Sequence, residues 1–265
     1  MEHQARKRFG QHFLHDPGVI QRMINAIHPC AGDTLVEIGP GLGAISRGLL
    51  ERLGRLHVVE LDRDVIPLLQ RACAGLGDLQ IHQQDALSFD LNDIIGPRPL
   101  RVVGNLPYNI STPLLFHLLE QIEQIADMHF LLQKEVVDRL TAPPGGNAYG
   151  RLSVMIQYHC QAMRLFDVAP GAFNPPPRVN SAVVRLIPHS QPLRVASNPQ
   201  HLGRLVRDAF SQRRKTLRNA LSLYCPPAMI EALEIDPQRR PETLSVDDFV
   251  RLSNACLDRQ GSKPV

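Results

Sequence analysis

Short apolar runs alternate with amphipathic stretches along the first half of the chain. The apolar runs predict strands at 34–38, 56–61, 79–83, 100–104 and 128–132. Apolar positions at helical spacing predict helices at 16–27, 44–53, 63–74 and 111–121. Strands that alternate with helices indicate βαβ units and a mostly parallel sheet. Ligands of such sheets bind beyond the carboxyl ends of the strands, so residues at those ends are the first candidates for a site.

Cap residues support two of the predicted helices. Asp16 is expected to cap the helix at 16–27, with Pro17 at its first position. Ser111 or Thr112 is expected to cap the helix at 111–121, and Pro113 lies just inside it.

The second half of the chain changes character near residue 188. Runs at 163–168 and 182–187 predict paired strands that close the sheet, separated by a proline-rich stretch at 173–177 that suits neither strand nor helix. A polar, turn-rich linker is expected at 188–199. Beyond it the pattern is helical only, with helices predicted at 202–210, 215–223, 227–233 and 246–257. We therefore expect an α/β fold, with a Rossmann-like sheet and helices on both faces in residues 1–188, and a small all-helical domain in residues 189–265.

Charge is unevenly distributed between these two parts. Residues 189–265 carry 12 Lys and Arg against 8 Asp and Glu, whereas residues 1–188 carry 17 against 18. A basic excess confined to one part suits a partner that is a polyanion. No apolar run approaches the roughly 18–20 residues that span a bilayer. The basic N-terminus is followed by no long apolar stretch, so we expect a cytoplasmic protein with no membrane partner.

Cysteine and histidine positions give little sign of metal or disulfide chemistry. The five cysteines are scattered, with no Cys-x-x-Cys pair, and we expect small buried side chains rather than a disulfide framework or a zinc site. The 11 histidines include no His-x-x-x-His, so no metal is expected. The hydrolase pattern Gly-x-Ser-x-Gly is also absent from the sequence.

A glycine-rich turn follows the first predicted strand, in the stretch Glu37-Ile38-Gly39-Pro40-Gly41-Leu42-Gly43. Glycines let the backbone turn sharply and approach a ligand closely. Glu60 ends the second strand, where a carboxylate can accept hydrogen bonds from both ribose hydroxyls. NAD proteins and methyltransferases share this pair of features, and Ala44 at the third glycine position of the dinucleotide motif is tolerated in both. Asp85 follows the third strand and is either a contact for an adenine amine or a turn residue.

The stretch Asn105-Leu106-Pro107-Tyr108 follows the fourth strand. The N6 amine of adenine is a poor nucleophile because its lone pair is delocalised into the ring. Two hydrogen-bond acceptors, the Asn105 side-chain oxygen and a backbone carbonyl such as that of Leu106, favour tetrahedral character and aim the lone pair at a methyl donor. Tyr108 offers a flat surface for the base, a contact worth about 1–3 kcal/mol. The alternative is a proline turn with a packed tyrosine.

Two further features suit a nucleic-acid substrate. Phe173 heads the proline-rich stretch and could stack on a flipped base from the other face, although such a residue alone is more often part of a core. Arg213, Arg214, Lys215 and Arg218 lie close together and suit phosphate contacts, or else form a solvated helix face. The N-terminal Arg6-Lys7-Arg8 adds to the basic surface.

These motifs resemble, in order and over nearly the whole chain, the bacterial small-subunit ribosomal RNA adenine N6,N6-dimethyltransferases. The resemblance rests on Arg8–Leu14, the glycine turn, Glu60-Leu61-Asp62, Gln84-Asp85-Ala86, Gly104–Ser111, Leu132–Glu135, Pro175–Val179 and Phe210–Lys215. It implies a class I methyltransferase sheet, S-adenosyl-L-methionine as cofactor, and dimethylation of two adjacent adenosines in a hairpin loop near the 3′ end of 16S RNA. It also implies an assembling 30S subunit as substrate, and we expect a monomer.

The same resemblance implies a set of cofactor contacts, at His12, Leu14, Gly39, Gly41, Glu60, Asp85 and Asn105. The family commonly has Asn where this chain has His12. If the contact at this position runs through the backbone, nothing changes. If it runs through the side chain, cofactor affinity becomes sensitive to pH.

Two alternatives stay open on the sequence. A related enzyme that methylates large-subunit RNA shares the sheet and an Asn-x-Pro-Tyr motif, but the 210–215 and 174–179 segments favour the small-subunit enzyme. A non-catalytic RNA-binding or assembly protein could keep the fold. The intact set of Gly39, Glu60, Asp85, Asn105 and Tyr108 argues against that interpretation.

Overall fold

The computed structural model describes residues 12–190, 195–211 and 215–261, the last four of these by backbone alone. The chain forms two compact units. The sheet unit comprises Met1–Val137 and Gln161–Pro188, and the helical unit comprises Asp138–Cys160 and His189–Val265. Residues 138–160 therefore pack with the helical unit, although the sequence pattern assigned them to the part before residue 188.

In the sheet unit, the elements up to β5 are β1 (Phe13–Leu14), α1 (Pro17–Ile27), β2 (Leu35–Ile38), α2 (Ser46–Leu53), β3 (Arg55–Val59), α3 (Ile66–Ala72), β4 (Asp78–His82), the 3₁₀ helix η2 (Leu91–Asp93) and β5 (Leu100–Asn105). The remaining ones are α4 (Ser111–Leu119), η3 (Ile122–Gln124), β6 (Ile125–Gln133), β7 (Cys160–Val168), η4 (Pro170–Ala172), β8 (Phe173–Asn174) and β9 (Ser181–Pro188). The helix α5 (Lys134–Leu140) carries the chain from the first unit into the second.

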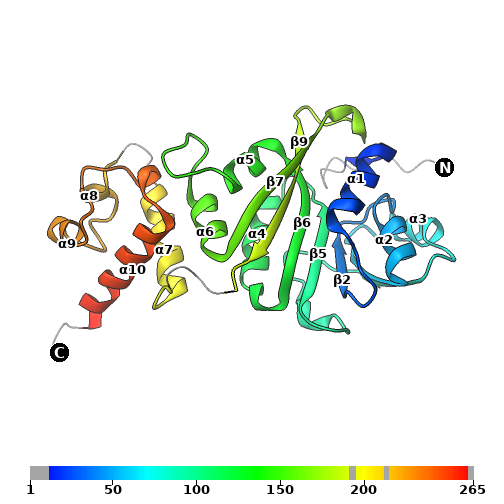
Figure 1. Cartoon of the computed structure of the whole chain (residues 1–265), viewed down its shortest axis with the longest axis horizontal. Helices are drawn as coiled ribbons and strands as arrows, with labels where there is room; N and C mark the ends of the chain where they lie inside the picture. Colours follow the sequence, from blue (N-terminus) through cyan, green and yellow to red (C-terminus); the bar gives the residue numbers. More distant parts are fainter. Residues whose placement is uncertain (1–11, 191–194, 212–214, 262–265) are drawn as a thin grey trace. The chain divides into compact units, whose positions relative to one another are not determined.

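Among the described residues, seven strands form one sheet in the order β4-β3-β2-β5-β6-β9-β7 (Figure 1). The strands from β4 to β6 pair in parallel, and β9 pairs with β6 in the antiparallel direction. Strands β1 and β8 form a separate antiparallel pair, with Phe13 opposite Asn174. The predicted parallel sheet and its closing strands are thus confirmed.

The core of this unit lies between the sheet and the helices that follow its strands. Helix α1 contributes Met23 and Ile27, and α2 contributes Leu49 and Leu50, all of them almost fully buried. Asp16 caps α1 as expected, because its side chain accepts a hydrogen bond from the N–H of Val19. This packing fixes the strand ends from which the site is built.

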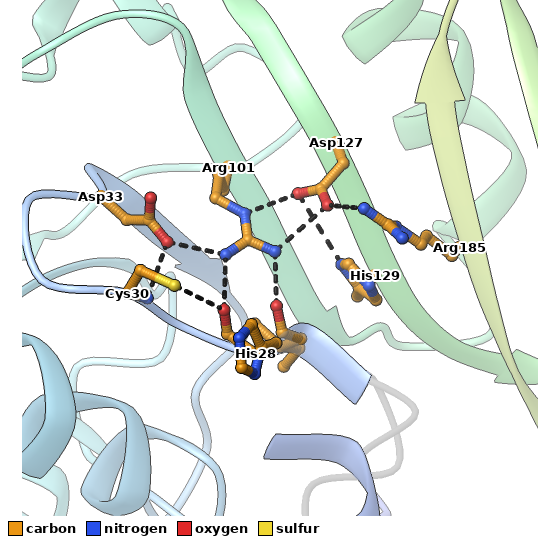
Figure 2. A network of polar contacts seen from close by, with 8 residues as sticks. His28, Cys30, Asp33, Arg101, Asp127, His129 and Arg185 are labelled. Atoms are coloured by element: carbon orange, nitrogen blue, oxygen red, sulfur yellow. Dashed lines mark hydrogen bonds and ion pairs between the residues drawn. The ribbon is translucent and has the colours of Figure 1, made fainter. Parts of the chain in front are cut away.

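A polar network around the buried Asp127 ties together the amino-terminal ends of the parallel strands. Figure 2 shows Arg101 of β5 between Asp33 and Asp127, with its Nε atom 2.8 Å from Asp127 and its Nη1 atom 2.7 Å from Asp33. The same guanidinium donates to the carbonyl of His28, just after α1. Arg185 of β9 also donates to Asp127, at 2.9 Å. One carboxylate thus links β5, β6 and β9.

His129 lies beside this network without joining it by a hydrogen bond. Its Nδ1 atom is 3.8 Å from Asp127, and the side chain is fully buried. Burial lowers the pKa of His129 to about 4, against the attraction of Asp127. The ring is therefore neutral at physiological pH, and the network's positive charges are those of the two arginines.

The elements of the helical unit are α6 (Arg151–His159), α7 (Pro199–Phe210), α8 (Leu217–Ala220), α9 (Pro227–Ala232), η5 (Pro241–Thr243) and α10 (Val246–Gly261). Helices α6, α7 and α10 pack on one another around buried leucines and Phe249. The predicted helices after residue 200 are confirmed, with α8 shorter than expected.

Several expectations about local structure are wrong. Helices α5 and α6 were not predicted, and β8 interrupts a stretch expected to hold no strand. Helix α4 has no side-chain cap: Ile110 is its N-cap residue, and the Ser111 hydroxyl donates instead to the Tyr108 carbonyl at 3.0 Å.

The cysteines depart from expectation as well. Cys225 and Cys256 form a disulfide, because the segment before α9 and the helix α10 bring two distant residues together. Cys30 is exposed rather than buried, whereas Cys73 and Cys160 are buried as expected. Among the described residues, no group of three or more His, Cys, Asp or Glu side chains could hold a metal ion. Of the helices in those same ranges, none is long and apolar enough to cross a membrane.

Candidate active site

A pocket with a cavity volume of about 170 Å³ opens at the carboxyl ends of the parallel strands. It lies wholly within the sheet unit. Its lining comes from the segment around β1 and from the loops after β2, β3, β4 and β5. The lining includes the expected cofactor contacts His12, Leu14, Gly39, Gly41, Glu60, Asp85 and Asn105, together with Leu106 and Tyr108. The strand order therefore brings together residues that lie nearly a hundred positions apart.

The loop after β2 depends on glycine for its path. Gly39 and Gly41 have positive φ angles of 67° and 55°, a region that favours glycine. A Cβ atom at Gly41 would lie 3.1 Å from the ring of Phe13. The Gly39 N–H donates to the Val59 carbonyl at 2.9 Å, which joins the loop to β3. At Gly39 and Gly41 the loop thus presents bare backbone to the pocket, and Pro40 and Leu42 also line it.

Two carboxylates at successive strand ends take the positions that the sequence predicted. Glu60 is 8% exposed, and its Oε1 atom accepts a hydrogen bond from the Asp62 N–H at 2.8 Å. Burial raises the pKa of Glu60, although backbone N–H groups of Asp62 and Gly41 counter part of the shift. Asp85 is exposed at the pocket and also closes a turn, because its Oδ1 atom accepts from the Leu87 N–H at 2.9 Å.

Glu37 is a further carboxylate in the pocket lining, and the sequence did not single it out as a site residue. It is 1% exposed, and its Oε2 atom has no hydrogen-bond partner among the described residues. Burial raises the pKa of Glu37 to about 7, and the neighbouring Glu60 adds to the shift. With Glu60 and Asp85, it gives the pocket an acidic lining that suits a cationic ligand.

Asn105 is oriented by the segment that precedes β1. Its Nδ2 atom donates to the His12 carbonyl at 3.0 Å, so its Oδ1 atom stays available to accept from a ligand. The Leu106 carbonyl likewise accepts no hydrogen bond from the part of the chain that is described. These are the two acceptors that the sequence analysis required.

The hydroxyl and the ring of Tyr108 each have a neighbour that limits their movement. Its hydroxyl lies 2.6 Å from the Ser181 Oγ atom, and its ring centroid lies 5.4 Å from that of His12. The His12 Nδ1–H donates to the Pro175 carbonyl at 2.7 Å. Within the protein, His12 thus makes contacts through its backbone, to Asn105, and through its ring, to Pro175 and Tyr108. Ser181 was not singled out from the sequence, since it approaches the motif only through folding. Pro175 belongs to a segment that carried the family resemblance, but its contact with His12 was not expected.

Phe173 is not among the residues that line the pocket, although it was expected to offer a second stacking surface there. It is 2% exposed and belongs to the core, with Leu14 as its strand partner. The physical reason is the pairing of β8 with β1, which turns the ring inward. The aromatic side chain before the prolines is therefore a packing residue in this structure.

Only part of the expected RNA-binding cluster can be placed. Lys215 and Arg218 are exposed in the helical unit, at and near the start of α8. Arg213 and Arg214 lie outside the described residues, as do Arg6, Lys7 and Arg8.

Comparison with known proteins decides between the cofactor classes that this type of pocket serves. A sequence profile described as ribosomal RNA adenine dimethylase matches residues 2–258. The chain belongs to the ribosomal RNA adenine dimethylase family. This membership makes it an rRNA adenine dimethyltransferase and sets aside the NAD interpretation of the glycine turn.

Relatives of this dimethylase share almost its whole length. It is 56% identical to the Ribosomal RNA small subunit methyltransferase A of Pseudomonas aeruginosa, over 99% of this chain and 98% of that protein. It is 57% identical to the protein of the same name in Nitrosococcus oceani, over 97% and 98% of the two chains.

Solved structures show the same fold. A dimethyladenosine transferase from Plasmodium falciparum has a TM-score of 0.78 and 26% identity, over 91% of this dimethylase and 96% of that chain. The 23S rRNA methyltransferase ErmE has a TM-score of 0.72 at 22% identity, over 92% and 98%. The latter likeness concerns the fold alone.

Proposed function

We propose that this dimethylase transfers methyl groups from S-adenosyl-L-methionine to the N6 atoms of two adjacent adenosines in small-subunit ribosomal RNA. The target is the hairpin loop near the 3′ end of 16S RNA, and the substrate is the assembling 30S subunit. The name shared by relatives at 56–57% identity supports the choice of subunit. The observation that carries the chemistry is the hydrogen bond from Asn105 to the His12 carbonyl, which leaves the amide oxygen free at the pocket.

The residues of the pocket fit S-adenosyl-L-methionine. The unpartnered Oε2 atom of buried Glu37 and the carboxylates of Glu60 and Asp85 suit a cationic ligand that carries ribose hydroxyls and an adenine amine. Gly39 and Gly41 leave bare backbone at two positions of the loop that would lie against it. When bound, the cofactor supplies an electrophilic methyl group on a positively charged sulfur.

The protein's task is then to position and orient the target amine. The Asn105 Oδ1 atom and the Leu106 carbonyl accept the hydrogen bonds of N6, which turns the lone pair out of the ring plane. Tyr108 holds the flipped base by stacking. Each transfer makes N6 cationic until it releases a proton to solvent. After the first transfer the amine therefore still carries one hydrogen, and one acceptor contact remains for the second.

We further propose that the helical unit binds RNA. This unit includes residues 189–265, in which Lys and Arg outnumber Asp and Glu by 12 to 8. Lys215 and Arg218 are exposed there, and with Arg213 and Arg214 they suit phosphate contacts. The methyltransferase site proper lies in the sheet unit.

The deciding experiment is methyl transfer from radiolabelled cofactor to purified small and large subunits, with mono- and dimethyladenosine resolved by mass spectrometry. We expect dimethyladenosine on small subunits only. Label on large subunits would favour the large-subunit enzyme, and label on neither would favour a non-catalytic assembly protein.

Asn105→Ala should slow single-turnover transfer severely while small-subunit binding stays nearly unchanged. Loss of the acceptor misaligns the amine, which acts on the transition state more than on the bound ground state. Asn25→Ala, an exposed amide on α1, is the matched control. Dimethyladenosine formation by Asn105→Ala at the wild-type rate would remove Asn105 from catalysis.

A further inference from the structure

One contact of the active-site motif reaches a residue to which nothing above assigns a role in the reaction. The hydroxyl of Tyr108 lies 2.6 Å from Ser181 Oγ, which is inside ordinary O–H···O hydrogen-bond distance. Ser181 is fully buried and is the first residue of β9, where it stands opposite Gln133 of β6. A rigid, doubly paired part of the sheet thus holds the polar end of a pocket residue.

Tyr108 needs such an anchor because it lies on a loop. It follows β5 by three positions, beyond the last residue of the strand. A tyrosine side chain turns about two torsions, and a stacking surface that turns freely must be ordered again whenever a base binds. The Ser181 hydrogen bond fixes the far end of the ring, while His12 lies beside the ring itself.

We propose that Ser181 is a positioning residue for methyl transfer. Its hydroxyl holds the ring of Tyr108 in the plane that aligns the target adenine with the acceptors at Asn105 and Leu106. Ser181 acts through Tyr108 and does not itself touch the base. This inference rests on the proposed function, because it assigns Ser181 a part in the same base-methylating site.

The competing explanation is that Ser181 only stabilises β9. A buried hydroxyl that loses its partner destabilises the fold, and a less stable enzyme also gives less product. The two explanations differ in what a double-mutant cycle measures. If Ser181 acts through the tyrosine hydroxyl, removing either hydroxyl removes the same effect, and removing both adds nothing further.

The experiment compares the wild-type dimethylase with Ser181→Ala, Tyr108→Phe and the double variant. Each is used in excess over small subunits, in single turnovers with S-adenosyl-L-methionine at saturation. The rate constant at saturating enzyme reports on folded molecules, so a loss of stability alone leaves it unchanged. We expect each single variant to lower this rate constant roughly tenfold, the scale of a modest misalignment, and the double variant to match the slower single one.

Two further readouts separate positioning from structure. Cofactor affinity, measured by calorimetry, should stay within twofold of wild type in every variant. The enzyme concentration at half-saturation should change little, because the stacking ring remains in place. Ser153→Ala is the matched control: Ser153 is also fully buried and accepts from the Gly150 N–H at 3.0 Å, but it lies in the helical unit. It should lose stability and keep the wild-type rate constant.

The proposal is overturned if Ser181→Ala reacts at the wild-type rate, or if the two substitutions lower the rate independently. If Ser181→Ala fails to fold, Tyr108→Phe still decides, because it keeps the ring and removes only the hydroxyl that Ser181 holds. A wild-type rate for Tyr108→Phe would then refute the proposal. Failure of the proposed function gives a different result, in which the wild-type dimethylase itself leaves small subunits unmethylated.

Discussion

Four of the pocket residues that the sequence identified share one property: each stands at or just beyond the end of a parallel strand. Glu60, Asp85, Asn105 and Tyr108 could be predicted because the carboxyl ends of such strands meet at one edge. Ser181, and the contact of Pro175 with His12, could not be predicted, since both pairs meet across more than seventy positions of sequence. Phe173 was misassigned because an aromatic residue beside prolines resembles an exposed loop, whereas the pairing of β8 with β1 buries it.

Glu60 provides the most direct test of the cofactor site. Glu60→Ala should weaken S-adenosyl-L-methionine binding by about 1–3 kcal/mol, the range for losing hydrogen bonds to a charged acceptor. Calorimetric titration measures the affinity. Glu51→Ala is the control, because Glu51 is an exposed carboxylate on α2. Unchanged affinity in Glu60→Ala would exclude Glu60 from the site.

Glu37 should make stability depend on pH. Its pKa in the folded state is about 7, above its ordinary value of 4.5, so the folded protein binds more protons between these pH values. The stability contribution of the protonated carboxyl is complete below pH 4.5 and is lost as pH rises through 7. The loss reaches about 3 kcal/mol at high pH.

Glu37→Gln removes the titrating group and should flatten this dependence. Urea unfolding of the wild-type protein and of the variant, compared at pH 5 and pH 8, measures the difference in free energy of unfolding. The variant should gain relative to wild type at pH 8. Equal differences at the two pH values would show that Glu37 does not titrate with a raised pKa.

At the scale of elements, the sequence pattern predicted a helix correctly where only one face of the helix is apolar. It failed where the helix is buried on all sides. Helix α1 has a polar face, a capping Asp16 and Pro17 at its start, so it was predicted correctly. Helix α6 buries Leu152, Val154, Met155 and Ile156, which point in all directions around the helix. Without a periodic polar face it gave no helical pattern. The Cys225–Cys256 disulfide was missed for a related reason, since spacing does not show which elements pack together.

The network around Asp127 ties three strands at the edge of the sheet opposite the pocket. Asp127 is 4% exposed, and Arg101 and Arg185 both donate to it. Asp127→Asn should lower the free energy of unfolding by up to about 3–5 kcal/mol, because Arg185 loses the carboxylate that it pairs with and Arg101 keeps only the pair with Asp33. Urea unfolding measures the loss.

A surface pair of the same chemistry gives the control for this substitution. Asp78 pairs with Arg55 at 2.8 Å, but both side chains are largely exposed. Asp78→Asn should change stability little, because exposed pairs are screened by water and salt. Equal effects of the two substitutions would mean that burial of the Asp127 network contributes nothing.

For the whole molecule, the sequence located the change from sheet to helices and the basic excess that accompanies it. It did not show that residues 138–160 leave the sheet unit and that the chain returns to it at β7, although Pro143-Pro144-Gly145-Gly146 marks a turn inside this segment. The helical unit remains the more basic of the two units when residues 138–160 are counted with it, since the cluster from Arg213 to Arg218 lies there. Chemistry and RNA capture can therefore be tested by separate substitutions.

Replacing Arg213, Arg214 and Lys215 together by Gln should weaken binding of small subunits and leave cofactor affinity unchanged. Each phosphate contact releases bound counterions, so the slope of log affinity against log salt should fall by roughly 2–3 when three contacts are lost. Filter binding over a range of salt concentrations measures the slope.

The control is a triple variant with the same change in net charge, made at three exposed cations of the sheet unit, Arg52, Arg63 and Arg71. If both triple variants shift the slope equally, overall charge rather than this cluster attracts the RNA. If neither shifts it, the basic segment is a solvated helix face.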